Sequence, residues 1–134
     1  MEQQVNQLNS LVLAYIGDAI YEVHVRNHLI QTGQINPHEL QQRAVQYVSA
    51  KAQSEIMHHL LTIDFLEDEE KGVVRRGRNA KSNSIPKNAS VQAYRYATAF
   101  EALMGYHYLK KNEDRLHELI HLSLQYVVNK LRNE

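Results

Sequence analysis

Residues that interrupt helices are scarce in this chain. Five glycines and two prolines occur among its 134 residues, and the stretches between them are rich in Ala, Leu, Gln, Glu, Lys and Arg, which favour helix. A β-rich fold of this size would need more of the residues that make tight turns. The sequence therefore predicts an all-α protein folded as a compact helical bundle, and its length fits one domain over residues 1–134.

The composition excludes several classes of protein. The chain has no cysteine, which rules out disulfide bonds and thiolate metal sites. No apolar run approaches the roughly 18 residues that a membrane span needs, and the N-terminal residues lack the basic and then apolar layout of a signal peptide. We therefore expect a cytoplasmic protein that does not act in a membrane.

Apolar residues spaced three and four apart, together with capping residues, predict a series of helices joined by short connections. The predicted helices run from about 10 to 30 with Ser10 as N-cap, from Pro37 with Asn36 and Glu39 in capping-box spacing, from Ser49 to Leu61, from a capping box of Asp64 and Glu67 to about Gly77, from Ser90 to Lys110, and from Asn112 to about Leu131. Residues 82–88 are predicted to form a loop.

Positive and negative charges are separated along the chain although they balance overall. Residues 64–70 contain five acids and no base, whereas residues 71–95 contain seven bases and no acid. Such a block creates a strong local positive field, and the small polar residues within it add backbone N–H groups that suit phosphate contact. The alternative is a solvated loop with ordinary charges. The bases that we single out are Arg75, Arg76, Arg78, Lys81 and Lys87.

Two carboxylates lie inside apolar helical stretches, each close to a glycine. Asp18 directly follows Gly17, and Glu101 lies one turn before Gly105. A glycine costs a helix interior roughly 1 kcal/mol relative to alanine, so we expect close helix packing to compensate. Helices that approach through these glycines would bring the two carboxylates together, which is unfavourable unless a cation lies between them. Oxygen ligands favour Mg²⁺ or Mn²⁺ over zinc.

The apolar neighbours of Asp18 predict that its carboxylate is buried. A buried carboxylate must find a partner, a hydrogen bond or a metal ion. The alternative to a metal site is therefore that Asp18 caps another helix or pairs with an arginine.

A further motif suggests different chemistry. Residues 117–121 match the H-E-x-x-H pattern of zinc proteases, in which two histidines bind zinc and the glutamate acts as base. Such a site needs a third protein ligand, usually further along the chain, and the sole acid after His121 is Glu134. A chance match among eight histidines is the favoured explanation, and the pair His58 and His59 is interpreted as helix surface.

Several segments resemble the ribonuclease III catalytic domain. Residues 13–22 (LAYIGDAIYE) resemble its signature helix, and residues 98–105 (TAFEALMG) resemble its second acidic motif. Residues 75–82 (RRGRNAKS) and 86–88 (PKN) are similar to the Mini-ribonuclease III subfamily in particular, the bacterial form that lacks a double-stranded-RNA-binding domain. The resemblance covers nearly the whole chain.

This resemblance implies a homodimeric, all-α endoribonuclease that cleaves double-stranded RNA with Mg²⁺, for which Mn²⁺ can substitute. It implies that the substrate is the precursor of 23S ribosomal RNA, trimmed at both ends with a ribosomal protein assisting. By their positions in the motifs, Asp18 and Glu101 are the implied catalytic residues and metal ligands. Hydrolysis would leave 5′-phosphate and 3′-hydroxyl ends, and the basic residues singled out above would position the duplex through its phosphates.

Two positions depart from the larger ribonuclease III enzymes. Their signature carries a glutamate where this chain has Ala14 and an aspartate where it has Thr98. Both are metal-site acids in those enzymes, so the number of bound metal ions stays open. Glu22, one turn after Asp18, is a further candidate to assist.

Two other functions stay open, the first of them because of the missing acids. One is a non-catalytic RNA-binding or ribosome-assembly factor on the same helical scaffold. The other is an all-helical, metal-dependent nucleotide hydrolase, which would turn over free nucleotides and ignore duplex RNA. A Mg²⁺-dependent cleavage assay on duplex RNA separates the three possibilities.

Overall fold

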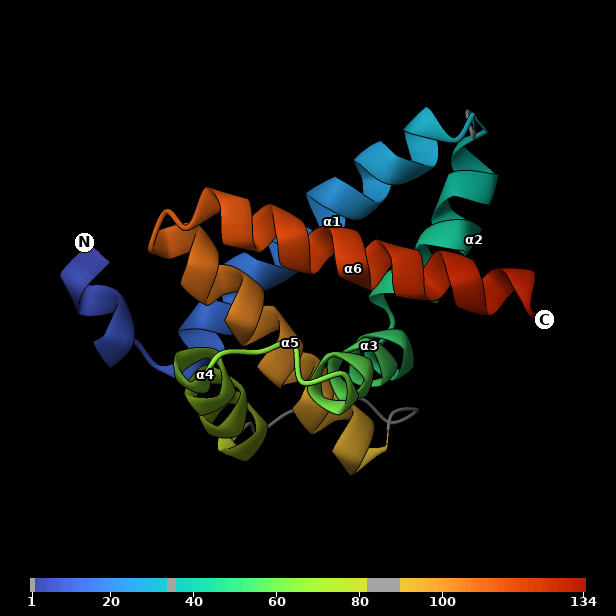
Figure 1. Ribbon diagram of the computed structural model, residues 1–134. Helices are drawn as coiled ribbons and strands as arrows, with labels where there is room; N and C mark the ends of the chain where they lie inside the picture. The colour runs from blue at the N-terminus through green and yellow to red at the C-terminus, as the bar shows by residue number, and fades with distance from the viewer. Residues whose placement is uncertain (1, 34–35, 82–89) are drawn as a thin grey trace.

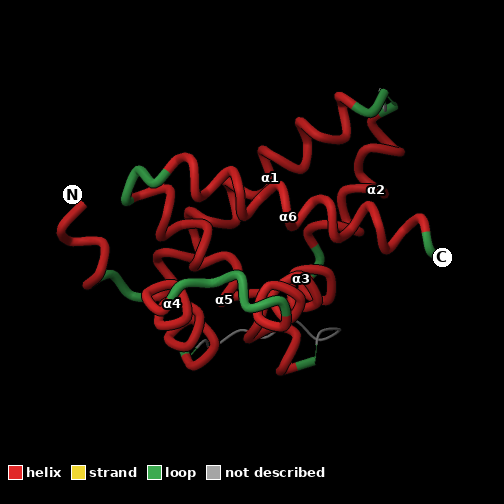
Figure 2. The backbone as a smooth tube through the Cα atoms, in the orientation of Figure 1, coloured by secondary structure: helices red, strands yellow, loops and turns green. Residues whose placement is uncertain are grey.

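The computed structural model describes residues 2–33, 36–81 and 90–134 (Figure 1). These residues form six α-helices and one short 3-10 helix, with no strand among them (Figure 2). The prediction of an all-α fold is confirmed for this part of the chain, and the predicted loop at 82–88 lies outside it. The elements are η1 (Glu2–Gln7), α1 (Ser10–Gln31), α2 (Pro37–Val48), α3 (Ala50–Thr62), α4 (Asp68–Asn79), α5 (Val91–Leu109) and α6 (Glu113–Arg132).

Helix α5 forms the centre of the bundle, with α1, α3 and α4 packed along it (Figure 1). Every residue from 97 to 107 except Glu101 is buried, as is typical of a helix that is apolar around most of its circumference. Phe100 meets Tyr21 of α1 edge to face, with ring centroids 4.8 Å apart, and Met104 belongs to the same core. Glu101 is therefore the exception in the most buried part of the fold.

Side-chain caps begin three helices where the sequence predicts them. Asn36, Ser49 and Ser90 each accept a hydrogen bond from a backbone N–H two or three residues further on, which satisfies a donor that the first helical turn leaves free. The prediction of Ser10 as the cap of the first helix is wrong by one residue. Asn9 is the N-cap, because its side-chain oxygen reaches a first-turn N–H at 2.7 Å.

Helix α4 starts and ends later than predicted. Its capping box joins Glu67 and Glu70, whereas Asp64 lies in the preceding connection with a left-handed backbone (φ 52°). The box forms one turn later because the buried Glu70 accepts the Glu67 N–H at 2.8 Å. Gly77 lies inside the helix and does not end it. A Cβ at Gly77 would lie 2.8 Å from the Cα of Ala99, so this glycine allows α4 to pack closely on α5.

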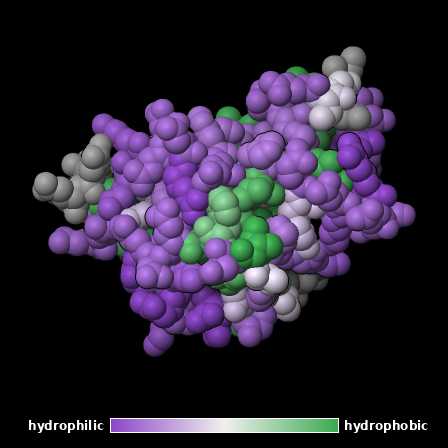
Figure 3. Space-filling view, in the orientation of Figure 1, coloured by the Kyte–Doolittle hydropathy of each residue, from purple (hydrophilic) through white to green (hydrophobic). Residues whose placement is uncertain are grey.

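The molecular surface is mostly hydrophilic on the face shown in Figure 3, with a hydrophobic area near its centre. None of the described helices is long and apolar enough to cross a membrane. Along one side of α1, large apolar side chains are exposed to solvent. They are Val12, Tyr15, Val23 and Ile30, and Tyr15 is the most exposed of them at 84%. We refer to these four residues as the α1 apolar stripe.

Candidate active site

Helices α1 and α5 touch through their backbones at two glycines. A Cβ added to Gly17 would lie 1.7 Å from the carbonyl oxygen of Glu101, and one added to Gly105 would lie 1.9 Å from that of Leu13. No side chain fits at either position, because real Cβ atoms essentially never approach other atoms within 3.0 Å. The expectation that these helices approach through their glycines is therefore confirmed.

This crossing brings Asp18 and Glu101 together. Burial, a hydrogen bond with Asp18 and the negative charge of Asp18 all act to raise the pKa of Glu101 to about 8. Two carboxylates in one partly buried place cannot both ionise cheaply without a cation. The two acids that the sequence singled out, 83 positions apart by their numbers, thus form one acidic pair.

Asp18 is exposed, so the prediction that its carboxylate is buried is wrong. The apolar residues around it in sequence do not all face the core, because Tyr15 and its neighbours in the α1 apolar stripe point to solvent. Among the described residues, Asp18 neither caps a helix nor forms an ion pair with an arginine. The acidic pair therefore has one half-buried member, Glu101, and one exposed member, Asp18, that solvent and a substrate can reach.

Gln53 of α3 is a site residue that the sequence analysis missed. Its side chain is 1% exposed, and its carboxamide contacts the Glu101 carboxyl, where it opposes the rise in pKa. Its Nε2 also donates to the carbonyl oxygen of Val48 at 3.1 Å, while its Oε1 is buried with no hydrogen-bond partner among the described residues. The signal in the sequence is a polar residue on the buried side of a helix, next to Ile56 and Met57.

The acidic pair fits a hard divalent cation. Its donors are carboxylate oxygens, which Mg²⁺ and Mn²⁺ prefer, and a cation would relieve the repulsion that raises the pKa of Glu101. The positions that are acidic in larger relatives add no ligand, since Ala14 is apolar and the Thr98 hydroxyl donates to the Tyr94 carbonyl at 3.0 Å. No group of three His, Cys, Asp or Glu side chains suited to a metal ion occurs in the described part of the chain. Mg²⁺ tolerates such a sparse set because it keeps several of its waters.

The basic residues of α4 lie in two environments. Arg75 and Arg76 are exposed near the end of the helix, as is Lys81 beyond it. Arg78 is partly buried and donates to the hydroxyl of Tyr96 at 3.3 Å. Tyr96 is on α5, the helix that carries Glu101, so Arg78 links the basic residues to the helix of the acidic pair. Lys87, the remaining predicted contact, lies outside the described residues.

Glu22 lies one turn after Asp18 and forms an ion pair with Arg26 at 3.4 Å. This pair connects neighbouring turns of α1 on its surface. The suggestion that Glu22 assists at the acidic pair stays a prediction.

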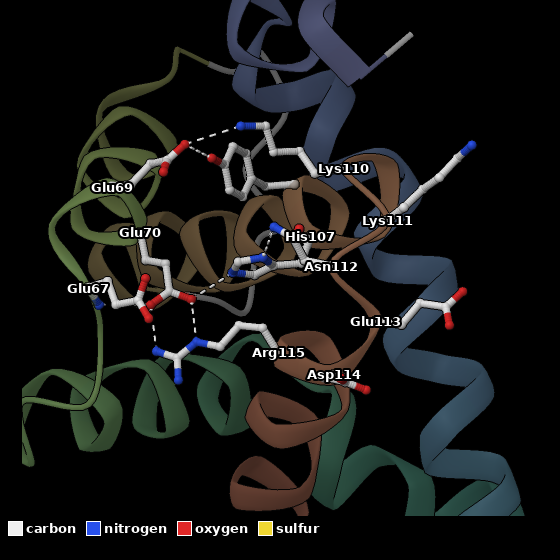
Figure 4. A pocket seen from close by; sticks show the side chains of 11 residues that line it. Glu67, Glu69, Glu70, His107, Lys110, Lys111, Asn112, Glu113, Asp114 and Arg115 are labelled. Carbon is white, nitrogen blue, oxygen red and sulfur yellow. Dashed lines mark hydrogen bonds and ion pairs between the residues drawn. The ribbon is translucent and has the colours of Figure 1, made fainter.

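A cavity of about 650 Å³ lies between the start of α4, the end of α5 and the start of α6 (Figure 4), and neither acid of the pair lines it. Beside it, the buried Glu70 accepts hydrogen bonds from Arg115 at 2.6 and 2.8 Å, and His107 Nε2 lies 2.6 Å from its Oε2. Burial alone would raise the pKa of Glu70, but the hydrogen bonds from Arg115 and His107 outweigh it and lower the pKa to about 2. These charges satisfy one another and hold three helices together.

The H-E-x-x-H pattern lies close to this network. Its glutamate, Glu118, accepts a hydrogen bond from Arg115 at 2.6 Å. The ring of His117 packs against that of His24, with centroids 5.5 Å apart. Pairing with an arginine argues against a role for Glu118 as a catalytic base.

Comparison with known proteins identifies the class to which this fold and acidic pair belong. The profile of the ribonuclease III domain matches residues 11–112, a range that includes both acids, both crossing glycines and all of α4. The chain therefore belongs to the ribonuclease III domain family.

Similarity extends over nearly the whole chain to Mini-ribonuclease 3 proteins. That of Enterococcus faecalis is 50% identical over 121 residues, which cover 90% of this chain and 92% of the relative. That of Streptococcus pneumoniae is 42% identical, with 92% and 96% covered. A protein of Fusobacterium nucleatum solved by X-ray crystallography is 33% identical with a TM-score of 0.80, over 91% of this chain and 96% of that one. Within its family the chain is thus of the Mini-ribonuclease 3 kind, an endoribonuclease of the ribonuclease III type.

Proposed function

We propose that this endoribonuclease cleaves double-stranded RNA at the acidic pair, with Asp18 and Glu101 as its catalytic residues. The observation that carries the proposal is the meeting of these two carboxyls where α1 and α5 cross at glycines. Backbone contact fixes their separation, and rigid placement of charge is what phosphodiester hydrolysis requires of a protein. The exposed side of Asp18 gives the scissile phosphate access.

Asp18 and Glu101 would hold a Mg²⁺ ion, for which Mn²⁺ can substitute. Such an ion lowers the pKa of a bound water and stabilises charge on the leaving oxygen. Glu101, from its half-buried position, would fix the orientation of the pair, while Asp18 would face the substrate. Hydrolysis in which the 3′-oxygen is the leaving group would give 5′-phosphate and 3′-hydroxyl ends.

The basic residues of α4 would position the duplex. An acidic pair repels RNA, so a neighbouring cationic surface is needed to hold the phosphates. Arg75, Arg76 and Lys81 are exposed for this purpose, and Arg78 is anchored to Tyr96; Lys87 is proposed to extend the surface. Proteins address A-form duplexes through phosphates and 2′-hydroxyls, so shape would outweigh sequence in selecting the substrate.

A homodimer would present one acidic pair to each strand of the duplex. The α1 apolar stripe supports this arrangement, because apolar side chains exposed along one helix side are typical of an interaction surface. Tyr15 lies three residues before Asp18, so a second copy seated on the stripe would border both acidic pairs. We propose that the dimer forms through this stripe.

The biological substrate that we propose is the precursor of 23S ribosomal RNA, trimmed at both ends in the cytoplasm with a ribosomal protein assisting. The similarity to Mini-ribonuclease 3 proteins over nearly the whole chain supports this proposal. Cleavage mapping on a ribosomal precursor tests it: the expected cuts fall at the two ends of the mature 23S sequence, and cuts elsewhere would contradict it.

The test of catalysis is cleavage of a labelled RNA duplex with Mg²⁺, compared with EDTA and with the same strand unpaired. Asp18→Asn and Glu101→Gln should each lower turnover by about 10²-fold or more, the scale for losing one group that stabilises a transition state, while circular dichroism shows an intact fold. Glu39→Gln, which makes the same change on the exposed surface of α2, serves as a matched control. Near-normal cleavage by both acid variants would refute the assignment.

A further inference from the structure

Gln53 is a buried side chain with polar contacts that a residue kept only for packing does not need. It is 1% exposed, its Nε2 is anchored to the Val48 carbonyl at 3.1 Å, and its carboxamide contacts Glu101. Its Oε1 has no hydrogen-bond partner among the described residues. A buried polar atom without a partner costs stability, and such atoms in native proteins call for a specific explanation.

An apolar side chain of the same length would avoid that cost. Methionine fills nearly the same volume and would leave no unpaired oxygen at this position. The neighbouring residues on the buried side of α3 are Ile56, Met57 and Leu60, so an apolar residue would suit its surroundings. Packing alone therefore does not account for a carboxamide at this position.

The geometry points to Gln53 as a positioning residue for the active site: anchored on the Val48 carbonyl, its carboxamide holds the Glu101 carboxyl in the orientation that faces Asp18. This inference rests on the proposed function of the acidic pair. An amide has two N–H donors, one for the carbonyl and one for the carboxyl. Being neutral, it can orient Glu101 without competing with a cation, as a lysine or arginine would.

A neighbouring side chain that orients Glu101 matters more in this site than it would in a site with more acidic ligands. Ala14 and Thr98 contribute no ligand, so among the described residues two carboxylates carry the site. Groups that hydrogen-bond to a metal ligand typically change metal affinity or activity by about 10- to 100-fold when they are lost. Gln53 is the buried side chain placed to act in this way on Glu101.

The test compares Gln53→Met with the wild-type protein in three measurements. Mn²⁺ binding without RNA, followed by electron paramagnetic resonance, should weaken by about 10- to 100-fold. Turnover of duplex RNA should fall by a similar factor with little change in KM, because the RNA surface on α4 is untouched. Thermal unfolding reports the folded fraction, to which both values are normalised. Ile56→Val on the same helix is the packing control and should leave both normalised values unchanged.

A double-mutant cycle separates positioning from a general effect. If Gln53 acts through Glu101, the loss of Mn²⁺ affinity caused by Gln53→Met should largely disappear in a Glu101→Gln background. Wild-type affinity and turnover in Gln53→Met, losses explained by the folded fraction, or equal losses in both backgrounds would each overturn the inference. If the wild-type protein itself binds no Mn²⁺ and cleaves no duplex, the proposed function fails instead.

Discussion

The carbonyl oxygen of Glu101 occupies the space that a side chain at position 17 would need. The separation of 1.7 Å from the expected Cβ of Gly17 is shorter than any non-bonded contact, so glycine is the residue that this helix crossing allows. The residue after Gly17 is Asp18, and Glu101 supplies both the carbonyl at the contact and the second carboxyl. The contact that packs the two helices therefore also sets the acidic pair.

Gly17→Ala should separate α1 from α5 and disable the site. Overpacking of a core typically costs about 1–3 kcal/mol, and a clash with backbone leaves no flexible side chain to move aside. We expect a loss at or above the upper end of that range in urea unfolding, with duplex cleavage reduced in the folded fraction. The control is Gly72→Ala, whose Cβ would meet an arginine side-chain end at 3.3 Å and which should stabilise α4 by up to about 1 kcal/mol. Equal free energies of unfolding and equal cleavage in the two variants would contradict the claim that the glycine contact between α1 and α5 sets the acidic pair.

The metal-free protein should become less stable as pH rises from about 4.5 to about 8. The pKa of Glu101 is raised from 4.5 to about 8 in the folded state, so between these values the native state binds more protons than the unfolded state and the free energy of unfolding falls. One group can contribute a slope of at most about 1.4 kcal/mol per pH unit. Chemical unfolding in EDTA across this range measures it. Glu101→Gln should flatten the dependence, and an unchanged slope in that variant would assign it to another group.

Loss of Glu70 should destabilise the fold without touching the acidic pair. Removing one partner of a buried ion pair typically costs about 3–5 kcal/mol, and Glu70→Gln leaves Arg115 without its buried carboxylate. Because the pKa of Glu70 is lowered to about 2, its contribution is present above about pH 4.5 and is lost as pH falls from 4.5 towards 2. Urea unfolding at neutral and acid pH tests both statements. Glu118→Gln, which removes the exposed partner of the same arginine, should cost less than about 1 kcal/mol.

Arg75→Ala should weaken duplex RNA binding and its dependence on salt. Each lost phosphate contact should reduce the slope of log affinity against log salt by roughly 0.7–0.9, if duplex RNA behaves as DNA does. Titrations at several salt concentrations, in EDTA and the Asp18→Asn background so that the proposed cleavage is suppressed, measure the slope. Arg132→Ala removes the same charge at the end of α6 and should leave the slope unchanged. If both variants changed it equally, the RNA surface would lie elsewhere.

The helix pattern could be predicted because helix starts depend on neighbouring residues. Asn36, Ser49 and Ser90 can cap because each lies within a few bonds of the N–H groups that need an acceptor. The start of α4 could not be predicted in this way. Both Asp64 and Glu67 suit a capping box by spacing, and burial of Glu70 against Arg115, contributed by a distant helix, selects the second.

The acidic pair was within reach of sequence reasoning because each acid has a glycine within one turn. The exposure of Asp18 was not, since apolar neighbours reveal burial only when it is known which of them face the core, and those of the α1 apolar stripe do not. Gln53 could not be identified either, because the sequence alone does not show which side of α3 faces Glu101. A single polar residue in a helix indicates a site only after packing has placed it beside Glu101.

Because main chain meets main chain at the crossing of α1 and α5, the distance between the two acids does not depend on the size of any side chain between them. Exchanges among surrounding core residues can alter the stability of this protein while leaving the spacing of Asp18 and Glu101 intact. An engineer who wished to change the metal preference of the proposed site would accordingly keep both glycines and vary the groups that surround the carboxyls, beginning with the amide at position 53.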